Sequence, residues 1–115
     1  MWNKVAGMFG AAAVGAGAVG AHALPKDLPA SFKDIYKTGA SYHLIHAGAL
    51  LTAALALPKG RKRNIVCALF STGIVLFSGS CYVVALKGQR KPFSYPAPIG
   101  GGALICAWIA AGFLP

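Results

Sequence analysis

The sequence predicts an all-α integral membrane protein, a bundle of four transmembrane helices with a short amphipathic helix at the membrane interface between the first and second. Hydrophobic residues make up 57% of the chain and charged residues only 11%, well below the roughly one quarter typical of soluble domains. Four apolar blocks of membrane-spanning character cover residues 5–24, 41–57, 65–86 and 97–114. They use nearly all of the 115 residues, so we expect one domain, 1–115, with no soluble catalytic part.

The first apolar block is dense in glycine and alanine. Small residues recur at every fourth position in two stripes, which are Gly7, Ala11 and Gly15, and Ala12, Ala16 and Gly20. In lipid, this spacing lets helix backbones approach closely, so we expect a central helix with neighbours on more than one side. The alternative is a signal peptide, since the segment 21–23 resembles a cleavage site. However, Lys4 alone makes a weak positive region, and the apolar run is long for a signal peptide.

The connection between the first two blocks predicts the short amphipathic helix. Phe32, Ile35 and Tyr36 recur with helical spacing and form one apolar stripe. Lys33 and Lys37 lie off that stripe, which suits a helix lying among lipid headgroups. A solvated helical linker is the alternative interpretation.

The remaining blocks are separated by two basic connections. The second block ends at Pro58 and is followed by a basic hairpin, 59–63, whereas the third is followed by the connection 87–96. Near its start, the fourth block contains three adjacent glycines, 100–102. Each of them weakens a helix by about 1 kcal/mol relative to alanine. Such glycines indicate close contact with another backbone. We expect helix packing at six glycines: Gly7, Gly15, Gly20, Gly79, Gly100 and Gly101.

Positive charge predominates, with eleven Lys and Arg against two acidic residues and a formal charge of +9. In a soluble protein this balance indicates nucleic acid, but here the cations lie in short segments between apolar blocks. We therefore expect anionic lipid headgroups, including cardiolipin, as partners, and no nucleic acid. The candidate lipid contacts are Lys59, Arg61, Lys62, Arg63, Lys87, Arg90 and Lys91.

Four spans would place both termini on the same side of the membrane as the basic hairpin. That side then carries Lys4 and the four cations of the hairpin, against six cations on the other side. Because this tally is nearly even, the positive-inside rule does not fix the orientation. The compactness of the hairpin favours termini on the cytoplasmic or matrix side.

The same alternation of spans brings several polar residues to one face of the membrane. The candidate cluster is His22, Tyr42, His43, His46, Ser78 and Tyr82. Its functional interpretations are a transition-metal site, haem ligation or a proton relay through imidazoles. In the structural interpretation, which we favour, the imidazoles hydrogen-bond across helices and fix their register. We expect no metal and no cofactor, because no carboxylate lies inside a span to orient an imidazole ligand.

The chain carries no recognisable catalytic motif. Residues 15–20 match GxGxxG literally, but they lie in an apolar span and follow no strand. Both aspartates lie in one connection and glutamate is absent, so no Ser/His/Asp set can form. The three cysteines, Cys67, Cys81 and Cys106, lie inside apolar blocks without metal-ligand spacing, and we expect no disulfide. These features predict that the protein is not an enzyme.

Four segments carry a family resemblance: GAGAVGAH (15–22), YKTGASYHLIHAGALL (36–51), FSGSCYVVALKG (77–88) and APIGG (97–101). Together they resemble a family of small multi-pass membrane proteins of unknown function that includes human transmembrane protein 256 and bacterial inner-membrane relatives. The resemblance implies a four-helix membrane bundle and, for eukaryotic members, the mitochondrial inner membrane. It implies no activity, cofactor or catalytic residue, and the basic hairpin is more cationic than the family pattern.

The sequence thus favours a non-enzymatic accessory or structural subunit of a larger membrane assembly, such as a mitochondrial respiratory complex. The partners expected are anionic lipids and other membrane subunits. The alternative is a small transporter or proton-conducting protein that uses His22, His43 and His46, and a weaker alternative is an assembly factor.

Overall fold

The computed structural model describes all residues from Met1 to Pro115 and is entirely helical between its connections. Its elements are α1 (Trp2–His22), α2 (Ala30–Ala56), α3 (Arg61–Gly73), a π-helical turn η1 (Ile74–Ser78), α4 (Gly79–Lys87) and α5 (Pro96–Phe113). Because α3, η1 and α4 follow one another without a gap, they form one rod. The all-α prediction is confirmed.

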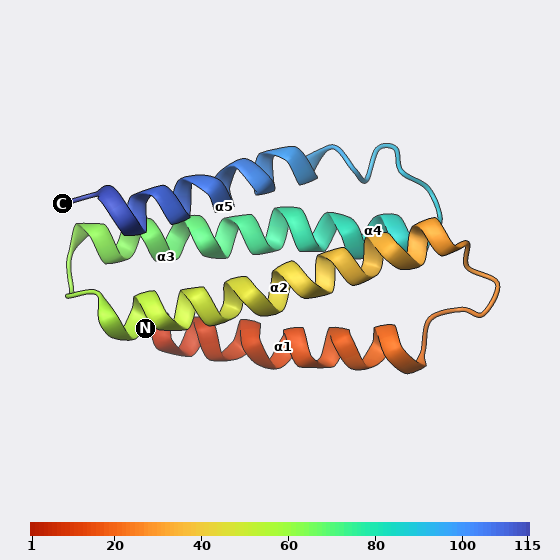
Figure 1. Ribbon diagram of the computed structural model, residues 1–115, viewed down its shortest axis with the longest axis horizontal. Coiled ribbons are helices and arrows are strands. Elements are labelled where there is room, and N and C mark those ends of the chain that lie inside the picture. The colour runs from red at the N-terminus through yellow and green to blue at the C-terminus, as the bar shows by residue number, and fades with distance from the viewer.

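The rods lie side by side in the order α1, α2, α3–α4 and α5 (Figure 1). Both termini and the connection between α2 and α3 lie at one end, which we call the hairpin end, and the other two connections lie at the opposite end. The molecule measures 48 × 25 × 18 Å. Four helices lying flat with axes about 8–10 Å apart would be wider than 25 Å, so the four rods form one curved layer rather than a flat one.

Three helices are long and apolar enough to cross a membrane: α1, the rod Arg61–Lys87 and α5. α2 is also long, at 27 residues, but it carries Lys33, Asp34, Lys37 and two histidines, which lower its hydropathy. The chain therefore has the character of a multi-pass membrane protein. The predicted fourth crossing by α2 stays a prediction.

α2 differs from the expected short helix followed by a separate span. It runs from Ala30 to Ala56 without a break, because no proline interrupts it and Gly39 is compatible with a helix. The separate amphipathic helix is therefore wrong, and its residues form the first turns of α2. The helix ends where Leu57, which precedes Pro58, adopts an extended conformation, as residues before proline usually do.

The central helix is α2 rather than α1. α2 lies against α1, α3, η1 and α4, whereas α1 lies mainly along α2 and buries only Ala6 and Ala13. The expectation of a central α1 is wrong because one of its two small-residue stripes turns away from the layer. No other residue lies within 4 Å of where a Cβ would stand at Gly7 or Gly15.

Two of the glycines predicted to pack are in close contacts. A Cβ at Gly20 would lie 2.8 Å from the ring of Tyr36, and one at Gly100 would meet the backbone of Leu76 and Phe77. Gly7, Gly15 and Gly79 meet no other residue within the chain, and Gly101 makes only an ordinary contact of 3.8 Å with Phe77. A small residue at helical spacing does not reveal which side of the helix the neighbour occupies.

Two further close approaches involve glycines that the spacing rule did not select. A Cβ at Gly39 of α2 would meet the Cβ of Cys81, and one at Gly73 of α3 would meet the side chain of Leu104. The same added Cβ at Gly73 would also lie 3.1 Å from the carbonyl oxygen of Gly100. The backbones of α3, η1 and α5 are therefore close together, and the π-helical turn lies beside this contact.

The buried residues divide the layer into an apolar and a more polar half. Near the hairpin end, α2, α3 and α5 contribute Leu50, Val66, Phe70 and Leu104 to the core. Toward the opposite end, the buried residues include the polar side chains of His43, Ser78 and Ser80. The candidate polar cluster therefore lies within the helices rather than in a connection.

Candidate functional site

His46 lies on α2 with both ring nitrogens hydrogen-bonded. Its Nδ1 is 2.7 Å from the carbonyl oxygen of Tyr42, and its Nε2 is 3.0 Å from Nε1 of Trp108 on α5. A carbonyl can only accept and an indole N–H can only donate, so the imidazole donates from Nδ1 and accepts at Nε2. This pattern fits the neutral ring and joins α2 to α5.

His43 lies one turn before His46 and has a different environment. Its Nδ1 is 2.8 Å from the hydroxyl of Tyr82 on α4, and the edge of its ring faces Phe9 of α1. The residue is only 6% exposed, yet its Nε2 is buried without a hydrogen-bond partner. This nitrogen is the one atom of the predicted cluster that has unused hydrogen-bonding capacity inside the layer.

Tyr42 connects the histidine face of α2 to the π-helical turn. Its ring stacks on His46 with centroids 5.6 Å apart and lies 4.7 Å from the ring of Phe77. Its side chain is 43% exposed, so the ring borders the outer surface of the molecule. Tyr42 and Phe77 therefore cover one side of His46.

Ser78 has a structural hydrogen bond. Its Oγ donates to the carbonyl oxygen of Gly39 at 2.8 Å, next to the point where Gly39 faces Cys81. The absence of a side chain at Gly39 allows α2 and α4 to approach closely enough for this bond. Interhelical serine bonds of this kind replace the water that a hydroxyl would otherwise require.

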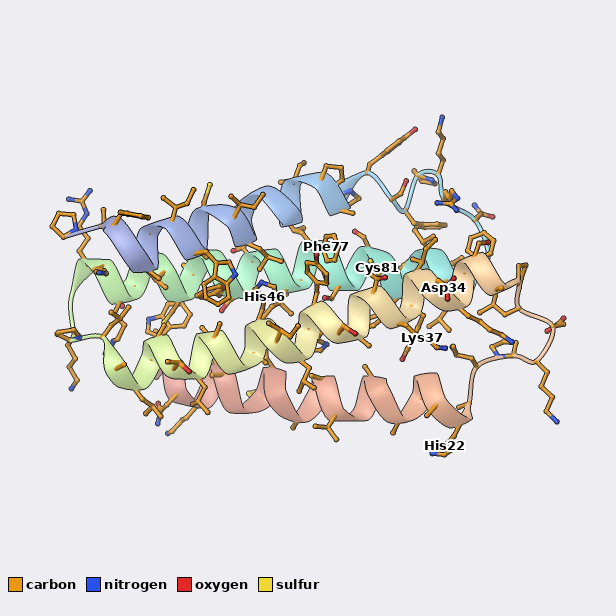
Figure 2. The ribbon with its side chains drawn as sticks, in the orientation of Figure 1. His22, Asp34, Lys37, His46, Phe77 and Cys81 are labelled. Atoms are coloured by element: carbon orange, nitrogen blue, oxygen red, sulfur yellow. The ribbon has the colours of Figure 1, made fainter.

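His22 does not join the other histidines. Figure 2 shows it at the end of α1, pointing away from the bundle, while His46 lies near the middle of the molecule. No group of three His, Cys, Asp or Glu residues is arranged to hold a metal ion. The six predicted residues therefore separate into a His43–Tyr82 pair, a His46–Tyr42 pair that Trp108 joins, Ser78, and an isolated His22.

The basic hairpin, Lys59 to Arg63, lies at the end of α2 and the start of α3. Lys59 and Arg61 are exposed and Lys62 is partly exposed. Arg63 instead turns back, and its Nη1 donates to the carbonyl oxygen of Ala54 at 3.3 Å. That carbonyl belongs to the last turn of α2, where helical carbonyls lack partners, so Arg63 stabilises the end of the helix.

The second group of cations, Lys87, Arg90 and Lys91, is exposed at the opposite end. The guanidinium of Arg90 lies over the ring of Phe32 at 5.8 Å. Both aspartates of the chain, Asp27 and Asp34, are also at this end. The opposite end is therefore of mixed charge, while the hairpin end has cationic side chains only.

An apolar groove between α2 and α5, which we call the α2/α5 groove, was not apparent from the sequence. Its wider section has a volume of about 530 Å³ and is lined by Tyr42, Ile45, His46, Phe77, Ile105 and Trp108, among others. Its narrower section, about 240 Å³, continues toward the hairpin end between Ala49, Thr52, Ala56 and Ala111. Trp108 lines both sections, and its bond to His46 joins α5 to α2 between them, so this indole divides the groove into its two sections.

Sequence reasoning found the histidines but missed their partners on other helices. Trp108 lies 62 positions after His46, and no local pattern links the two. Tyr36, read as part of an interfacial stripe, is 3% exposed, and its hydroxyl donates to the carbonyl oxygen of Ala16 at 2.6 Å. The only available signal was that an indole or phenol inside a membrane requires a polar partner.

Comparison with known proteins gives a family but no activity. A family model described as "Protein of unknown function (DUF423)" matches residues 16–101. The chain is 39% identical over 100 residues to the UPF0382 membrane protein YwdK of Bacillus subtilis. The matched region covers 84% of this chain and 80% of YwdK. No solved structure matches the chain significantly.

Two relatives from other bacteria agree with this match. The UPF0382 inner membrane protein YgdD of Escherichia coli is 34% identical over 83% of this chain and 73% of its own length. A UPF0382 membrane protein of Haemophilus influenzae is 33% identical over 87% of this chain and 81% of its own length. These bacterial relatives argue against the mitochondrial inner membrane, and they do not support the specific link to transmembrane protein 256.

Proposed function

This chain belongs to the DUF423 family of small multi-pass membrane proteins, and we propose that it is a non-enzymatic accessory subunit that packs against other proteins in a bacterial inner membrane. The printed description of one relative as an inner membrane protein supports the location. The mitochondrial respiratory complex is not part of this proposal. Lipids and neighbouring membrane subunits are the proposed partners.

The observation that carries the proposal is the outward-facing small-residue stripe of α1. We define the outer stripe as Gly7, Ala11 and Gly15, all of which are exposed. Ala11 and the buried Ala13 are two residues apart, which turns the helix by about 200°, so the outer stripe faces away from α2. Exposed glycine lowers helix stability by roughly 1 kcal/mol relative to alanine. Contact with a partner helix would offset that cost.

The small number of buried residues supports the same proposal. Only 23 of 115 residues are buried, and α1 is held by one neighbour along most of its length. A helix held on one side only can accept a second neighbour without rearrangement of the rest. We therefore place the partner against α1, on the side opposite to α2.

We also propose that α2 is a fourth crossing. Its 27 residues span about 40 Å, enough for the hydrocarbon core of about 30 Å. The histidines that lower its hydropathy face neighbouring helices and are hydrogen-bonded there, which reduces the cost of polar groups in lipid. Reporter fusions at Lys26, before α2, and at Gly60, after it, should fall on opposite sides of the membrane, and the same side for both would contradict a fourth crossing.

Native electrophoresis of membranes solubilised in mild detergent tests the accessory-subunit proposal. We expect the protein to migrate in a complex much larger than its own 11.8 kDa. The double variant Gly7→Leu/Gly15→Leu should release it, because leucine side chains on the outer stripe would hold a partner helix away. Gly48→Leu is the matched control, since Gly48 of α2 also has open space around it. Migration of the unaltered protein as a monomer or homodimer would contradict the proposal.

One observation favours the second candidate function, a proton-conducting or polar-solute protein. The buried Nε2 of His43 without a partner, next to the Tyr82 hydroxyl, is the kind of group that a proton or small polar solute could use. This candidate no longer includes His22, which is exposed, or His46, whose nitrogens are both engaged. Proton flux into liposomes containing the purified protein, lost in His43→Gln, would favour it. The assembly-factor alternative predicts only transient comigration with a complex.

A further inference from the structure

The α2/α5 groove opens on the membrane-facing surface along one side of α2. The lining residues of α2 recur at helical spacing from Tyr42 to Leu57, so the groove runs parallel to the helix rather than across it. Its walls are apolar apart from the Thr52 and Tyr42 hydroxyls and the imidazole of His46. Both nitrogens of that imidazole are already hydrogen-bonded. An occupant of these walls is therefore apolar over most of its length.

The length and position of the groove match one leaflet of a bilayer. Leu57 at its outer end and His46 within it are eleven residues apart, or about 16 Å along the helix. Half of a hydrocarbon core of about 30 Å is about 15 Å. A chain that entered at the hairpin end would meet Trp108, which is bonded to His46, before it reached that depth, so it would occupy the narrow section within one leaflet.

The positive charge at the open end of the groove indicates which headgroup a bound lipid would carry. Leu57 lines the narrow section and lies directly before Pro58 and the basic hairpin. Lys59, Arg61 and Lys62 are available there, whereas Arg63 is engaged with Ala54. No acidic side chain is present at this end, because Asp27 and Asp34 lie at the other. Such a cationic mouth suits a phosphate group.

Because the narrow apolar section lies next to the basic hairpin, we propose that the protein binds an anionic phospholipid specifically, with the phosphate at the basic hairpin and one acyl chain in the narrow section of the α2/α5 groove. The cations at the opposite end do not form an equivalent site, because the groove does not extend to Lys87, Arg90 and Lys91. This site lies away from the outer stripe of α1. The proposal is therefore independent of the accessory-subunit function.

Tryptophan fluorescence provides the test, because Trp108 lines both sections of the groove and is 51% exposed. In a Trp2→Phe background, Trp108 is the only tryptophan. The protein is reconstituted into vesicles of phosphatidylcholine and phosphatidylglycerol in which either one lipid or the other carries brominated acyl chains. Bromine quenches only indoles that the chain touches. We expect brominated phosphatidylglycerol to quench Trp108 with an apparent affinity about fivefold higher than brominated phosphatidylcholine.

Three variants locate the lipid. Lys59→Gln/Arg61→Gln/Lys62→Gln should bring the ratio of the two affinities to about one, whereas Lys87→Gln/Arg90→Gln/Lys91→Gln should leave it unchanged. Thr52→Leu/Ala56→Leu, which fills the narrow section, should also abolish the preference. Each ratio is measured within one variant, so partial loss of folded protein does not imitate the effect.

The depth-matched control places the tryptophan outside the groove. Met8→Trp in the Trp2→Phe/Trp108→Phe background lies on the exposed side of α1, six residues from its start, and should show no preference between the lipids. Equal quenching of Trp108 by both lipids would overturn the proposal. Weak quenching by both lipids would also overturn it, because a protein segment or second copy would then occupy the groove. Equal effects of the two charge variants on the affinity ratio would overturn it as well.

Discussion

The contact between α1 and α2 and the contact between the α3–η1 rod and α5 are built differently. At the second contact, Gly73 and Gly100 bring the backbones together, and a Cβ at Gly100 would collide with the backbone of Phe77. At the first, α1 contributes the buried Ala6 and Ala13 and the carbonyl oxygen that accepts from Tyr36. Most glycines of α1 touch nothing in the chain. The comparison teaches that glycine content alone does not identify a tight helix contact.

The largest effect is expected at Gly100. Gly100→Ala should destabilise the protein by about 1–3 kcal/mol, because backbone atoms of Leu76 and Phe77 cannot move as a flexible side chain would. Reversible unfolding in mixed detergent micelles measures this change. Gly101→Ala is the matched control, since a Cβ there would make an ordinary 3.8 Å contact with Phe77. Equal effects of the two substitutions would show that the α3–α5 contact is not closely packed at this point.

Tyr36→Phe should have the next largest effect, a loss of about 1 kcal/mol. The substitution removes the hydrogen bond to Ala16 but keeps the ring against Gly20. The loss should be visible as faster hydrogen exchange in α1, with little change in α5. Tyr95→Phe, at a residue that is 60% exposed, should leave both helices unchanged. Uniform acceleration across all helices would contradict a local role in docking α1.

A smaller effect is expected for the bond between His46 and Trp108. A double-mutant cycle with His46→Gln and Trp108→Phe should give a coupling of about 0.6 kcal/mol, the average for hydrogen bonds between membrane helices. The same cycle with His43→Gln in place of His46→Gln should give no coupling, because His43 contacts α1 and α4 rather than Trp108. Coupling of His43 to Trp108 would mean that the two histidines act as one cluster.

The smallest effect is expected in the outer stripe of α1. Gly7→Ala and Gly15→Ala should leave the purified protein unchanged or stabilise it by up to about 1 kcal/mol each, because alanine favours helix and the Cβ meets no atom. Thermal unfolding monitored by helical circular dichroism checks this expectation. A loss as large as that of Gly100→Ala would place the outer stripe inside a contact within the chain.

Composition and apolar block lengths predicted the helical architecture and the up-and-down order, because both follow from the lipid environment. The boundary at Pro58 was also predicted, since proline constrains the residue before it. The continuity of α2 was not, because only the absence of a helix breaker between Ile35 and Ser41 signals it. Which glycines pack depends on the side of the helix that a distant segment covers, and this information is not local.

For the histidines, too, the sequence predicts some features, and others depend on residues that are distant along the chain. Their spacing on one helix followed from the sequence, but their chemical states depend on residues that are distant along the chain. Trp108 and the carbonyl oxygen of Tyr42 complete the hydrogen bonds of His46, whereas Nε2 of His43 is buried without a partner. Two histidines three residues apart therefore differ in their surroundings more than their spacing indicates.

The most direct test of the accessory-subunit role is photo-crosslinking in intact cells with a small diazirine amino acid at Ala11, in the centre of the outer stripe. We predict a covalent adduct with another membrane protein at this position, and none with the same amino acid at the exposed Leu44 of α2. Lipid adducts alone at both positions, or equal protein adducts at both, would contradict the assignment of the outer stripe to a protein partner.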